Sequence, residues 1–242
     1  MFQSAALHFS TKIDGFCIND STNLKRLIKG AGKINQSKTR TLLPFTKQHL
    51  RAFISTSRAN DCLCYWRVTA SCIMAFFGFL RISEVVTMRM SDLCFEFFTI
   101  KLKIKRAKRH PSGFDAVIAR DNEFSNFVEE FWTKYKINYD SNFPCFPQIN
   151  GTKFKPIAAT TIQQDLKKIM KLLNMPISQY AFHSCKLGGT TKASEKGISK
   201  SEILALGHWK SSSMVDRYTR TTSKRLSELS QRLCENSFTM KK

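Results

Sequence analysis

Hydrophobic residues first follow a helical period after residue 43. In the segment that begins at Pro44, helical spacing is approached by Phe45, Leu50, Phe53 and Ile54. A nearly all-round apolar segment then runs from Tyr65 to Leu80. It carries Arg67 and is shorter than the roughly twenty residues of a membrane span, so we interpret it as a buried helix. The pattern therefore predicts two helices at the start of a domain.

The hydrophobic period changes to two after residue 98. Apolar residues alternate with lysines in the order Ile100, Lys101, Leu102, Lys103, Ile104 and Lys105. The turn sequence HPSG follows, and the alternation resumes at Phe114, Ala116 and Ile118. This pattern predicts a β-hairpin with one basic face.

Helical spacing returns in the rest of the chain. The stretch DNEFSNFVEEFWTKY carries an aromatic stripe that we assign to the core, namely Phe124, Phe127, Val128, Phe131, Trp132 and Tyr135. A further helix is predicted from Thr160 or Thr161 to Asn174, and a short one from about Gly188 to Lys196. Ser199 and Glu202 form a capping box for another short helix, which ends at Gly207. The predicted fold class is mainly α with a small antiparallel β-hairpin or sheet.

The charge balance adds a partner to this picture. The sequence has 39 Lys and Arg against 18 Asp and Glu, a formal charge of +21. This excess lies far above the magnitude of about 2–8 that solubility requires of a small domain. It favours an acidic polymer, and nucleic acid first, as the partner. A solvated, lysine-rich surface without a partner is the alternative.

The eight cysteines are scattered, and the N-terminal residues show no signal-peptide pattern. We therefore expect reduced thiols and an intracellular protein. Cys62 and Cys64 form a lone C-x-C without a matching second half. We expect no metal site there and interpret both residues as small hydrophobic side chains.

Six polar residues stand at the predicted ends of elements, where functional sites usually lie. They are Arg81, Lys108, His183, Lys186, His208 and Tyr218. Each has an ordinary structural alternative. That alternative is an ion pair with Glu84 for Arg81, a solvated turn charge for Lys108, and a packed aromatic ring for Tyr218.

In this order and at these intervals, the six residues resemble the tyrosine recombinase, or phage-integrase, family. The resemblance spans about Pro44 to Arg220, and its most specific parts are FLRISEV, FHSCKLGGTT and LGHWKSSSMVDRYTR. The motifs IKGAGK and LLPFTKQHL are similar to sequences of the transposon-borne, Crypton-like branch. The resemblance implies a tyrosine recombinase catalytic domain at residues 44–242. Residues 1–43 would be a linker or a remnant of an N-terminal core-binding domain, which indicates a truncated or decaying copy.

The resemblance also implies a reaction. Tyr218 would attack a DNA phosphodiester and form a 3′-phosphotyrosine with release of a 5′-hydroxyl, without a metal or other cofactor. Arg81 and Lys186 would hold the non-bridging phosphate oxygens. Lys108 would protonate the leaving 5′-oxygen as general acid.

The two histidines would assist at the same phosphate. His183 would accept the proton of Tyr218 or hold the phosphate, and His208 would donate a hydrogen bond to it. Further contacts to DNA are expected from Lys105, Arg106, Arg109, Trp209 and Lys210.

One position departs from the family pattern. Lys186 stands where the family's His-x-x-Arg motif has arginine, so the charge is kept but the planar, two-donor fork is lost. We expect a transposon-derived, site-specific recombinase that cuts and rejoins double-stranded DNA, self-associates on it, and is nuclear in a eukaryote. The main alternative is a DNA-binding protein that kept the fold and lost the reaction. A type IB topoisomerase and an RNA-binding basic protein are weaker alternatives.

Overall fold

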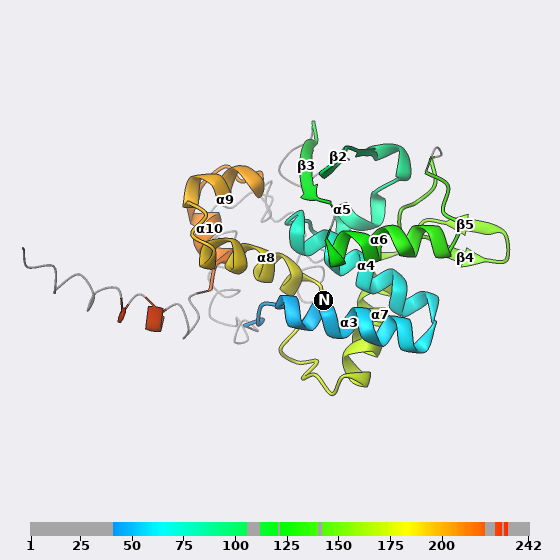
Figure 1. The fold of residues 1–242 in the computed structure, drawn as a ribbon, viewed down its shortest axis with the longest axis horizontal. Coiled ribbons are helices and arrows are strands. Elements are labelled where there is room, and N and C mark those ends of the chain that lie inside the picture. Colours follow the sequence, from blue (N-terminus) through cyan, green and yellow to red (C-terminus); the bar gives the residue numbers. More distant parts are fainter. Residues whose placement is uncertain are drawn as a thin grey trace, which may run out of the picture. The chain divides into compact units, whose positions relative to one another are not determined.

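The computed structural model describes residues 41–105, 112–120, 122–139, 142–220, 226–228 and 230–231. From Leu42 onward these residues belong to one compact unit. Its helices (Figure 1) are α3 (Lys47–Asn60), α4 (Leu63–Phe77), α5 (Ile82–Thr87), α6 (Glu123–Lys134), α7 (Ala159–Leu172), α8 (His183–Glu195), α9 (Lys200–Leu206) and α10 (Ser212–Tyr218), with a 3₁₀ turn η2 (Met90–Asp92). The predicted mainly helical fold class is confirmed.

The helix α4 is the centre of the larger hydrophobic core. Every residue from Trp66 to Phe76 is buried, because the segment is apolar on nearly all faces. The helices α3, α6, α7 and α8 all pack against it. The charged Arg67 is accommodated by donating to the carboxylate of Asp165 on α7 and to the carbonyl oxygen of Pro147. A buried cation needs such partners to offset its desolvation.

The strands form two separate antiparallel sheets. The first has the order β1 (Leu93–Phe95), β2 (Thr99–Ile104), β3 (Phe114–Ala119), and the second pairs β4 (Gln148–Asn150) with β5 (Lys153–Lys155). The predicted hairpin is the β2–β3 pair, which buries alternate residues and leaves Lys101 and Lys103 exposed. The pattern did not reveal β1, β4 or β5, because three residues are too few to show alternation.

Two helix boundaries differ from the sequence prediction. The buried helix α4 ends at Phe77 and not at Leu80, because Phe79 takes a left-handed φ of 50° after the cap at Gly78. Arg81 therefore does not end the buried helix but is the N-cap residue of α5. The helix α8 begins at His183, well before the predicted start.

Two glycines, Gly188 and Gly189, lie inside α8, where the sequence pattern places the start of a helix. A Cβ atom on Gly188 would lie 2.0 Å from the carbonyl oxygen of Phe45, and one on Gly189 would lie 2.0 Å from that of Phe76. Glycine is therefore required at both positions, since α8 crosses the backbone of two other segments at van der Waals distance. This contact fixes α8 against the end of α4 and the residues that lead into α3.

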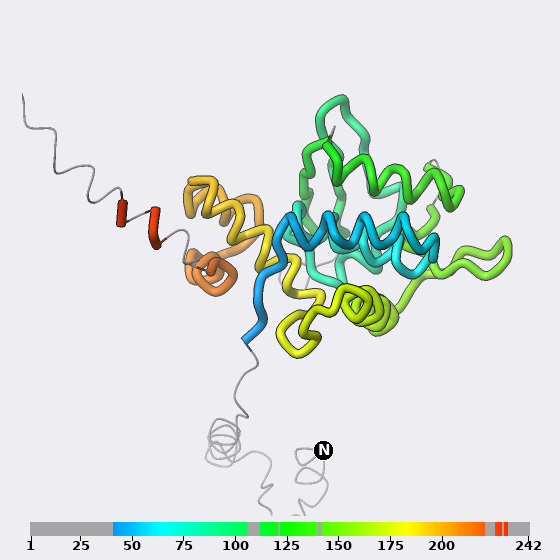
Figure 2. The backbone as a smooth tube through the Cα atoms, turned by 60° about the horizontal axis from the view of Figure 1, so that its bottom comes forward, coloured from blue at the N-terminus to red at the C-terminus, as the bar shows by residue number. Residues whose placement is uncertain are grey.

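A second, smaller core lies where α9 and α10 pack against α8. Figures 1 and 2 both show α9 and α10 beside α8 and away from β4 and β5. Its buried residues are Phe79, Leu187, Ile203, Trp209, Met214, Val215 and Tyr218. The predicted capping box of Ser199 and Glu202 opens α9, and Tyr218 is the last residue of α10.

We expect Gly188→Ala to destabilise the fold by about 3 kcal/mol, since the new methyl group forces α8 away from Phe45. In a helix interior without this contact, the same change stabilises by roughly 0.5–1 kcal/mol, so the sign of the effect is diagnostic. Urea denaturation measures it, with Ser194→Ala on the same helix as the control. A Gly188→Ala protein as stable as the wild type would contradict the close crossing.

Candidate active site

Side chains from two other segments, α8 and the residues between α9 and α10, surround the ring of Tyr218 at the end of α10. The ring of His183, the first residue of α8, lies 5.1 Å away between centroids, and the ring of Trp209 lies 4.9 Å away. The Nζ atom of Lys186 lies 5.4 Å from the same ring centroid. Tyr218 itself is only 7% exposed. The structure therefore brings together three of the residues that the sequence predicts for one site.

Lys186 is buried, and it forms no ion pair with a carboxylate among the described residues. Its residue is 1% exposed, and Nζ lies 5.0 Å from the centroid of Trp209, which stacks on Tyr218 at an interplanar angle of 12°. The faces of both rings attract the ammonium group at such distances. Burial and the positive charge of Arg81 nevertheless lower the pKa of Lys186 to about 7, while Glu84 opposes the shift. At neutral pH this amine exchanges easily between its charged and neutral forms.

Arg81 is fixed by a carboxylate three residues further along the chain. Its Nη1 donates to Oε1 of Glu84 at 2.8 Å, and its backbone N–H donates to Oε2 at 2.7 Å. The Glu84 side chain is almost fully buried, whereas that of Arg81 is 22% exposed. The ion pair that stood as the structural alternative is thus present. It uses only part of a guanidinium that has five N–H donors, so Arg81 can also bind an anion.

The imidazole of His183 lies among several cations. Burial lowers its pKa. Three positive charges lower it further, those of Lys186, Arg81 and Arg220. The neutral form is therefore favoured, and a neutral imidazole has one nitrogen that accepts a proton.

Arg220 is a residue of the cluster that the sequence analysis did not assign. It follows α10, and its backbone N–H donates to the hydroxyl of Thr191 on α8 at 3.1 Å. The sequence signal for it was a basic residue two positions after Tyr218. That signal is weak in a chain with 39 basic residues.

His208 and Trp209 are adjacent in sequence but lie in different surroundings. The ring of His208 stacks on Phe114 of β3, with centroids 4.2 Å apart. Trp209 is 6% exposed and lies between Phe79 and Tyr218, which favours packing over the direct DNA contact expected from the sequence. Its Nε1 has no hydrogen-bond partner among the described residues, although a buried indole N–H usually has one.

The remaining predicted residues are not part of the described cluster. Lys210 is exposed, and Lys105 is exposed and pairs through Nζ with Oδ1 of Asp92 at 2.6 Å. Lys108, Arg106 and Arg109 lie outside the described residues. Across the described ranges, no group of three or more His, Cys, Asp or Glu residues is placed to hold a metal ion. No described helix is both long and apolar enough to cross a membrane.

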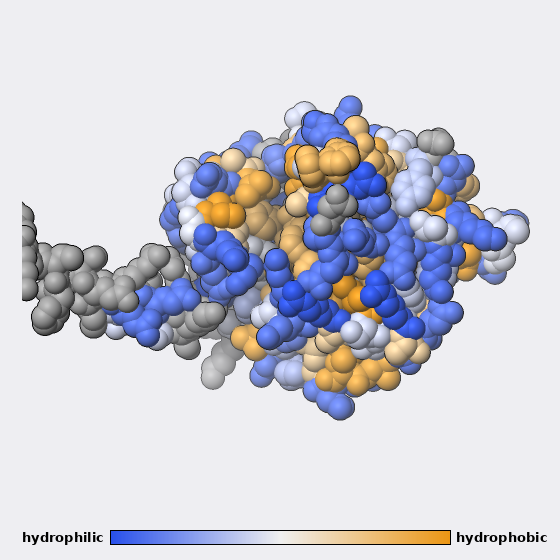
Figure 3. Space-filling model, in the orientation of Figure 1, coloured by the Kyte–Doolittle hydropathy of each residue, from blue (hydrophilic) through white to orange (hydrophobic). Residues whose placement is uncertain are grey.

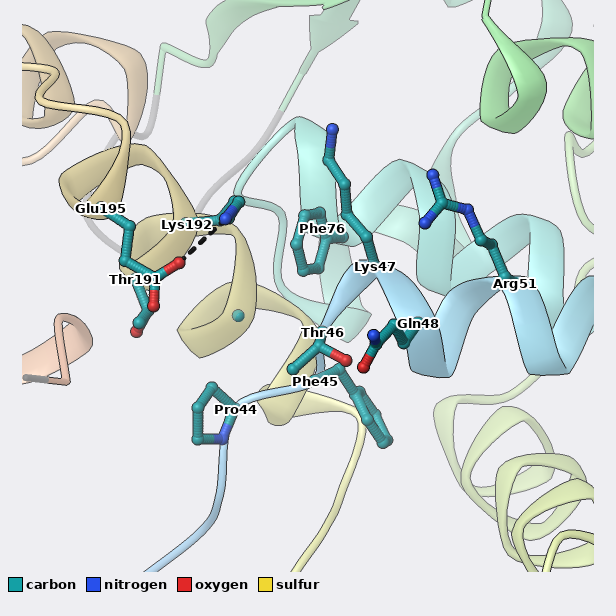
Figure 4. A pocket seen from close by; sticks show the side chains of 11 residues that line it. Pro44, Phe45, Thr46, Lys47, Gln48, Arg51, Phe76, Thr191, Lys192 and Glu195 are labelled. Carbon is teal, nitrogen blue, oxygen red and sulfur yellow. Dashed lines mark hydrogen bonds and ion pairs between the residues drawn. The ribbon is translucent and has the colours of Figure 1, made fainter. Parts of the chain in front are cut away.

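A separate hollow of about 400 Å³ lies between the start of α3 and another face of α8. Figure 4 shows Lys47 and Arg51 of α3 and Lys192 of α8 around it. Lys192 pairs with Glu195 at 3.0 Å, and Arg51 pairs with Glu123 at 2.6 Å. Because carboxylates accompany the cations, this hollow has mixed charge. The molecular face in Figure 3 is likewise mainly hydrophilic, with separate hydrophobic patches.

Comparisons with known proteins place the fold. The sequence model of the phage integrase family matches residues 44–225. XerA recombinase is similar in structure, with a TM-score of 0.61 and 14% identity over 82% of this chain and 65% of that one. XerH site-specific recombinase, in a post-cleavage complex with palindromic difH substrate, has a TM-score of 0.62 and 13% identity over 81% and 54%. The chain thus spans less than two thirds of either of these relatives.

A third similar structure is the Tn1549 transposon integrase in complex with transposon right end DNA. Its TM-score is 0.61, and its identity is 17% over 84% of this chain and 70% of that one. At these identities the likeness shows the fold alone. No curated protein sequence matches the chain.

We expect the stability of the protein to rise with pH between about pH 7 and pH 10 because of Lys186. Its pKa is about 7 in the fold and returns to its ordinary value of 10.5 on unfolding, so the unfolded chain binds more protons within this window. The free energy of unfolding then increases by at most about 1.4 kcal/mol per pH unit. Urea denaturation across the window measures the slope.

Lys186→Met keeps most of the side-chain volume and should remove this part of the slope. Lys192→Met, a half-buried position on the same helix, is the control and should keep it. Equal slopes in the wild type and in Lys186→Met would show that the amine is not buried as described.

Proposed function

The chain belongs to the phage integrase family, and from that premise we propose that it is a site-specific DNA tyrosine recombinase with Tyr218 as its nucleophile. The observation that carries the proposal is the meeting of Arg81, His183, Lys186 and Tyr218 in one cluster. They come from three stretches of the sequence, namely Arg81, the helical pair His183 and Lys186, and Tyr218, and three of the four carry basic groups. Such a group is suited to bind a phosphate beside a hydroxyl nucleophile.

In the proposed reaction, the Tyr218 oxygen forms a bond to phosphorus and the bond to the 5′-oxygen breaks. A protonated phenol is a weak nucleophile, so a base must take the Tyr218 proton during the attack. His183 is suited to this role, because its neutral form is favoured and its ring adjoins that of Tyr218. We assign Lys108 as the acid that protonates the leaving oxygen.

The cations would stabilise the transition state. Arg81 and protonated Lys186 would bind the non-bridging oxygens, whose negative charge grows as phosphorus becomes pentavalent. A phosphate between Arg81 and Lys186 would also relieve the repulsion that lowers the pKa of Lys186. We add Arg220 as a third cation and assign His208 as a hydrogen-bond donor to the same phosphate.

Double-stranded DNA is the proposed partner. The formal charge of +21 supports it, as do similar structures described as complexes with difH substrate and with transposon end DNA. Another similar structure is a lambda integrase dimer on a core site, and we propose self-association on DNA during strand exchange. The protein would act inside the cell, where its DNA is.

The domain assignment and the origin of the chain are part of the proposal. We assign residues 44–242 to the catalytic domain and residues 1–43 to a linker or a remnant of a core-binding domain. A transposon origin is supported by the likeness to the Tn1549 integrase. The proposed assignment to the Crypton-like branch depends on the motifs IKGAGK and LLPFTKQHL.

A second candidate function is DNA binding without cleavage. Two observations favour it: Lys186 lacks the planar fork of arginine, and Tyr218 is stacked on Trp209 with little exposure. For catalysis, the end of α10 would have to present the Tyr218 hydroxyl to the phosphate. A nicked duplex that traps the covalent intermediate separates the two candidates, because only an enzyme accumulates a detergent-resistant DNA adduct.

We expect Tyr218→Phe to abolish that adduct, because the substitution removes the attacking oxygen and keeps the stacked ring. DNA binding and thermal stability should stay close to those of the wild type. Gel separation of protein–DNA adducts and a binding titration measure both quantities. An adduct that persists in Tyr218→Phe would assign the nucleophile to another residue.

We expect Lys186→Arg to increase the yield of adduct on the same nicked duplex. A well-placed transition-state donor contributes about 10²–10³ in rate, and arginine offers two parallel donors where lysine offers a point charge. DNA affinity should change little, because the charge is conserved. Lys192→Arg is the matched control on α8.

The result is interpretable only if Lys186→Arg remains folded, which a thermal melt establishes. Robust wild-type activity with no gain from arginine would show that lysine suffices at this position. Absence of adduct in both proteins would favour the binding-only function.

A further inference from the structure

Two cysteines at the start of α4 have their thiols in contact. The Sγ atoms of Cys62 and Cys64 are 2.7 Å apart, and both residues are only partly buried. Cys62 is the N-cap residue of the helix, and Cys64 lies in its first turn. The sequence analysis interpreted them as small hydrophobic side chains, and the structure adds that both are partly exposed to solvent and that their sulfurs are in contact.

The two thiols differ in acidity. Burial alone would raise the pKa of Cys62, but hydrogen bonds from the Cys64 thiol and from the backbone N–H groups of Cys64 and Tyr65 outweigh it and lower the pKa. Burial raises the pKa of Cys64 to about 12, and the contact with Cys62 adds to the shift. One sulfur thus favours the thiolate, while its neighbour keeps its proton. Dithiol sites that exchange with disulfides show the same division.

From the contact between the two sulfurs and their access to solvent, we propose that Cys62 and Cys64 form a reversible thiol–disulfide site. Its co-substrate is a small disulfide such as oxidised glutathione. The Cys62 thiolate attacks one sulfur of that disulfide, forms a mixed disulfide and releases one glutathione thiolate. Cys64 then loses its proton and attacks Sγ of Cys62, which expels the second glutathione. The protein loses two electrons and two protons, and the small disulfide becomes two thiols.

The local structure suits this exchange. A disulfide bond is about 2.05 Å long, and the two sulfurs already lie 2.7 Å apart. Two charged groups of α7 act on the Cys64 thiol in opposite senses, since Asp165 raises its pKa and Lys168 lowers it. The Nζ atom of Lys168 lies 3.5 Å from Oδ1 of Asp165, whose other oxygen pairs with Arg67. A ring closed over so few residues constrains the unfolded chain less than a long loop would, so oxidation should change stability less than a disulfide between distant residues does.

The site is independent of the proposed recombinase site. Arg81 follows the opposite end of α4, a helix of 15 residues that spans about 22 Å at a rise of 1.5 Å per residue. The proposal therefore stands or fails without reference to DNA cleavage.

The test uses the full chain with Cys17, Cys94 and Cys234 replaced by serine, because Cys94 is exposed and the other two lie outside the described residues. The protein is equilibrated with mixtures of reduced and oxidised glutathione, its free thiols are alkylated, and its peptides are weighed by mass spectrometry. We expect the peptide with Cys62 and Cys64 to lose two hydrogen atoms and to regain them with dithiothreitol. Cys72 and Cys185, a buried interacting pair between α4 and α8, should stay alkylatable after unfolding and serve as the internal control.

Single variants identify the order of steps. Cys64→Ser should stop at the mixed glutathione disulfide on Cys62, and Cys62→Ser should react at Cys64 at least about 10-fold more slowly, since far less thiolate is present. Serine is a good N-cap residue, which suits position 62, and position 64 is only partly buried, so both variants should fold, as circular dichroism will establish. The proposal is overturned if the pair stays fully alkylatable in oxidised glutathione while the protein is folded, or if the two variants react at equal rates.

Discussion

The arrangement of the candidate site depends on the burial of the Lys186 amine against the faces of Trp209 and Tyr218. The helix α8 carries this lysine, and its glycines let it approach the backbone at Phe45 and Phe76 so closely that it has little freedom to shift. The pair α9–α10 then packs on α8 and covers the amine with its aromatic rings. Because a buried cation without a hydrogen-bonded counter-ion is costly, the same packing that completes the small core also creates a site that favours an anion.

The free protein lowers this cost in two ways. Glu84 neutralises Arg81, and Lys186 can lose its proton near pH 7. A bound phosphate would replace part of the role of Glu84 and would keep Lys186 protonated. It brings its own negative charge and accepts hydrogen bonds from several cations at once. In this account, the Tyr218 ring has two roles that do not conflict. It packs against Trp209 and covers Lys186, and in the proposed reaction the end of α10 presents its hydroxyl to the phosphate.

The sequence pattern predicts the parts of this structure that depend on local periodicity. It predicts α3, α6, α7 and the β2–β3 hairpin. The order of the motifs predicts that His183 and Lys186 lie near Tyr218. The pattern fails where tertiary contact decides: Phe79 ends α4 with a left-handed φ, and Gly188 reads as a boundary although a crossing backbone requires it inside α8. The near-neutral pKa of Lys186 and the contact between Cys62 and Cys64 were equally beyond the pattern, because both arise from packing and burial.

Titration of the Lys186 side chain by NMR tests directly whether this cluster binds a phosphate. Lysine labelled with ¹³C at Cε reports the protonation of each amine, and the spectrum of Lys186→Arg identifies the signal. We expect a midpoint near pH 7 in the free protein, because burial and Arg81 lower the pKa of Lys186 to about 7. With a saturating DNA duplex, the midpoint should rise by about one unit or more, because a phosphate stabilises the charged form. A midpoint that does not move when DNA binds would contradict the assignment of this cluster as the phosphate site.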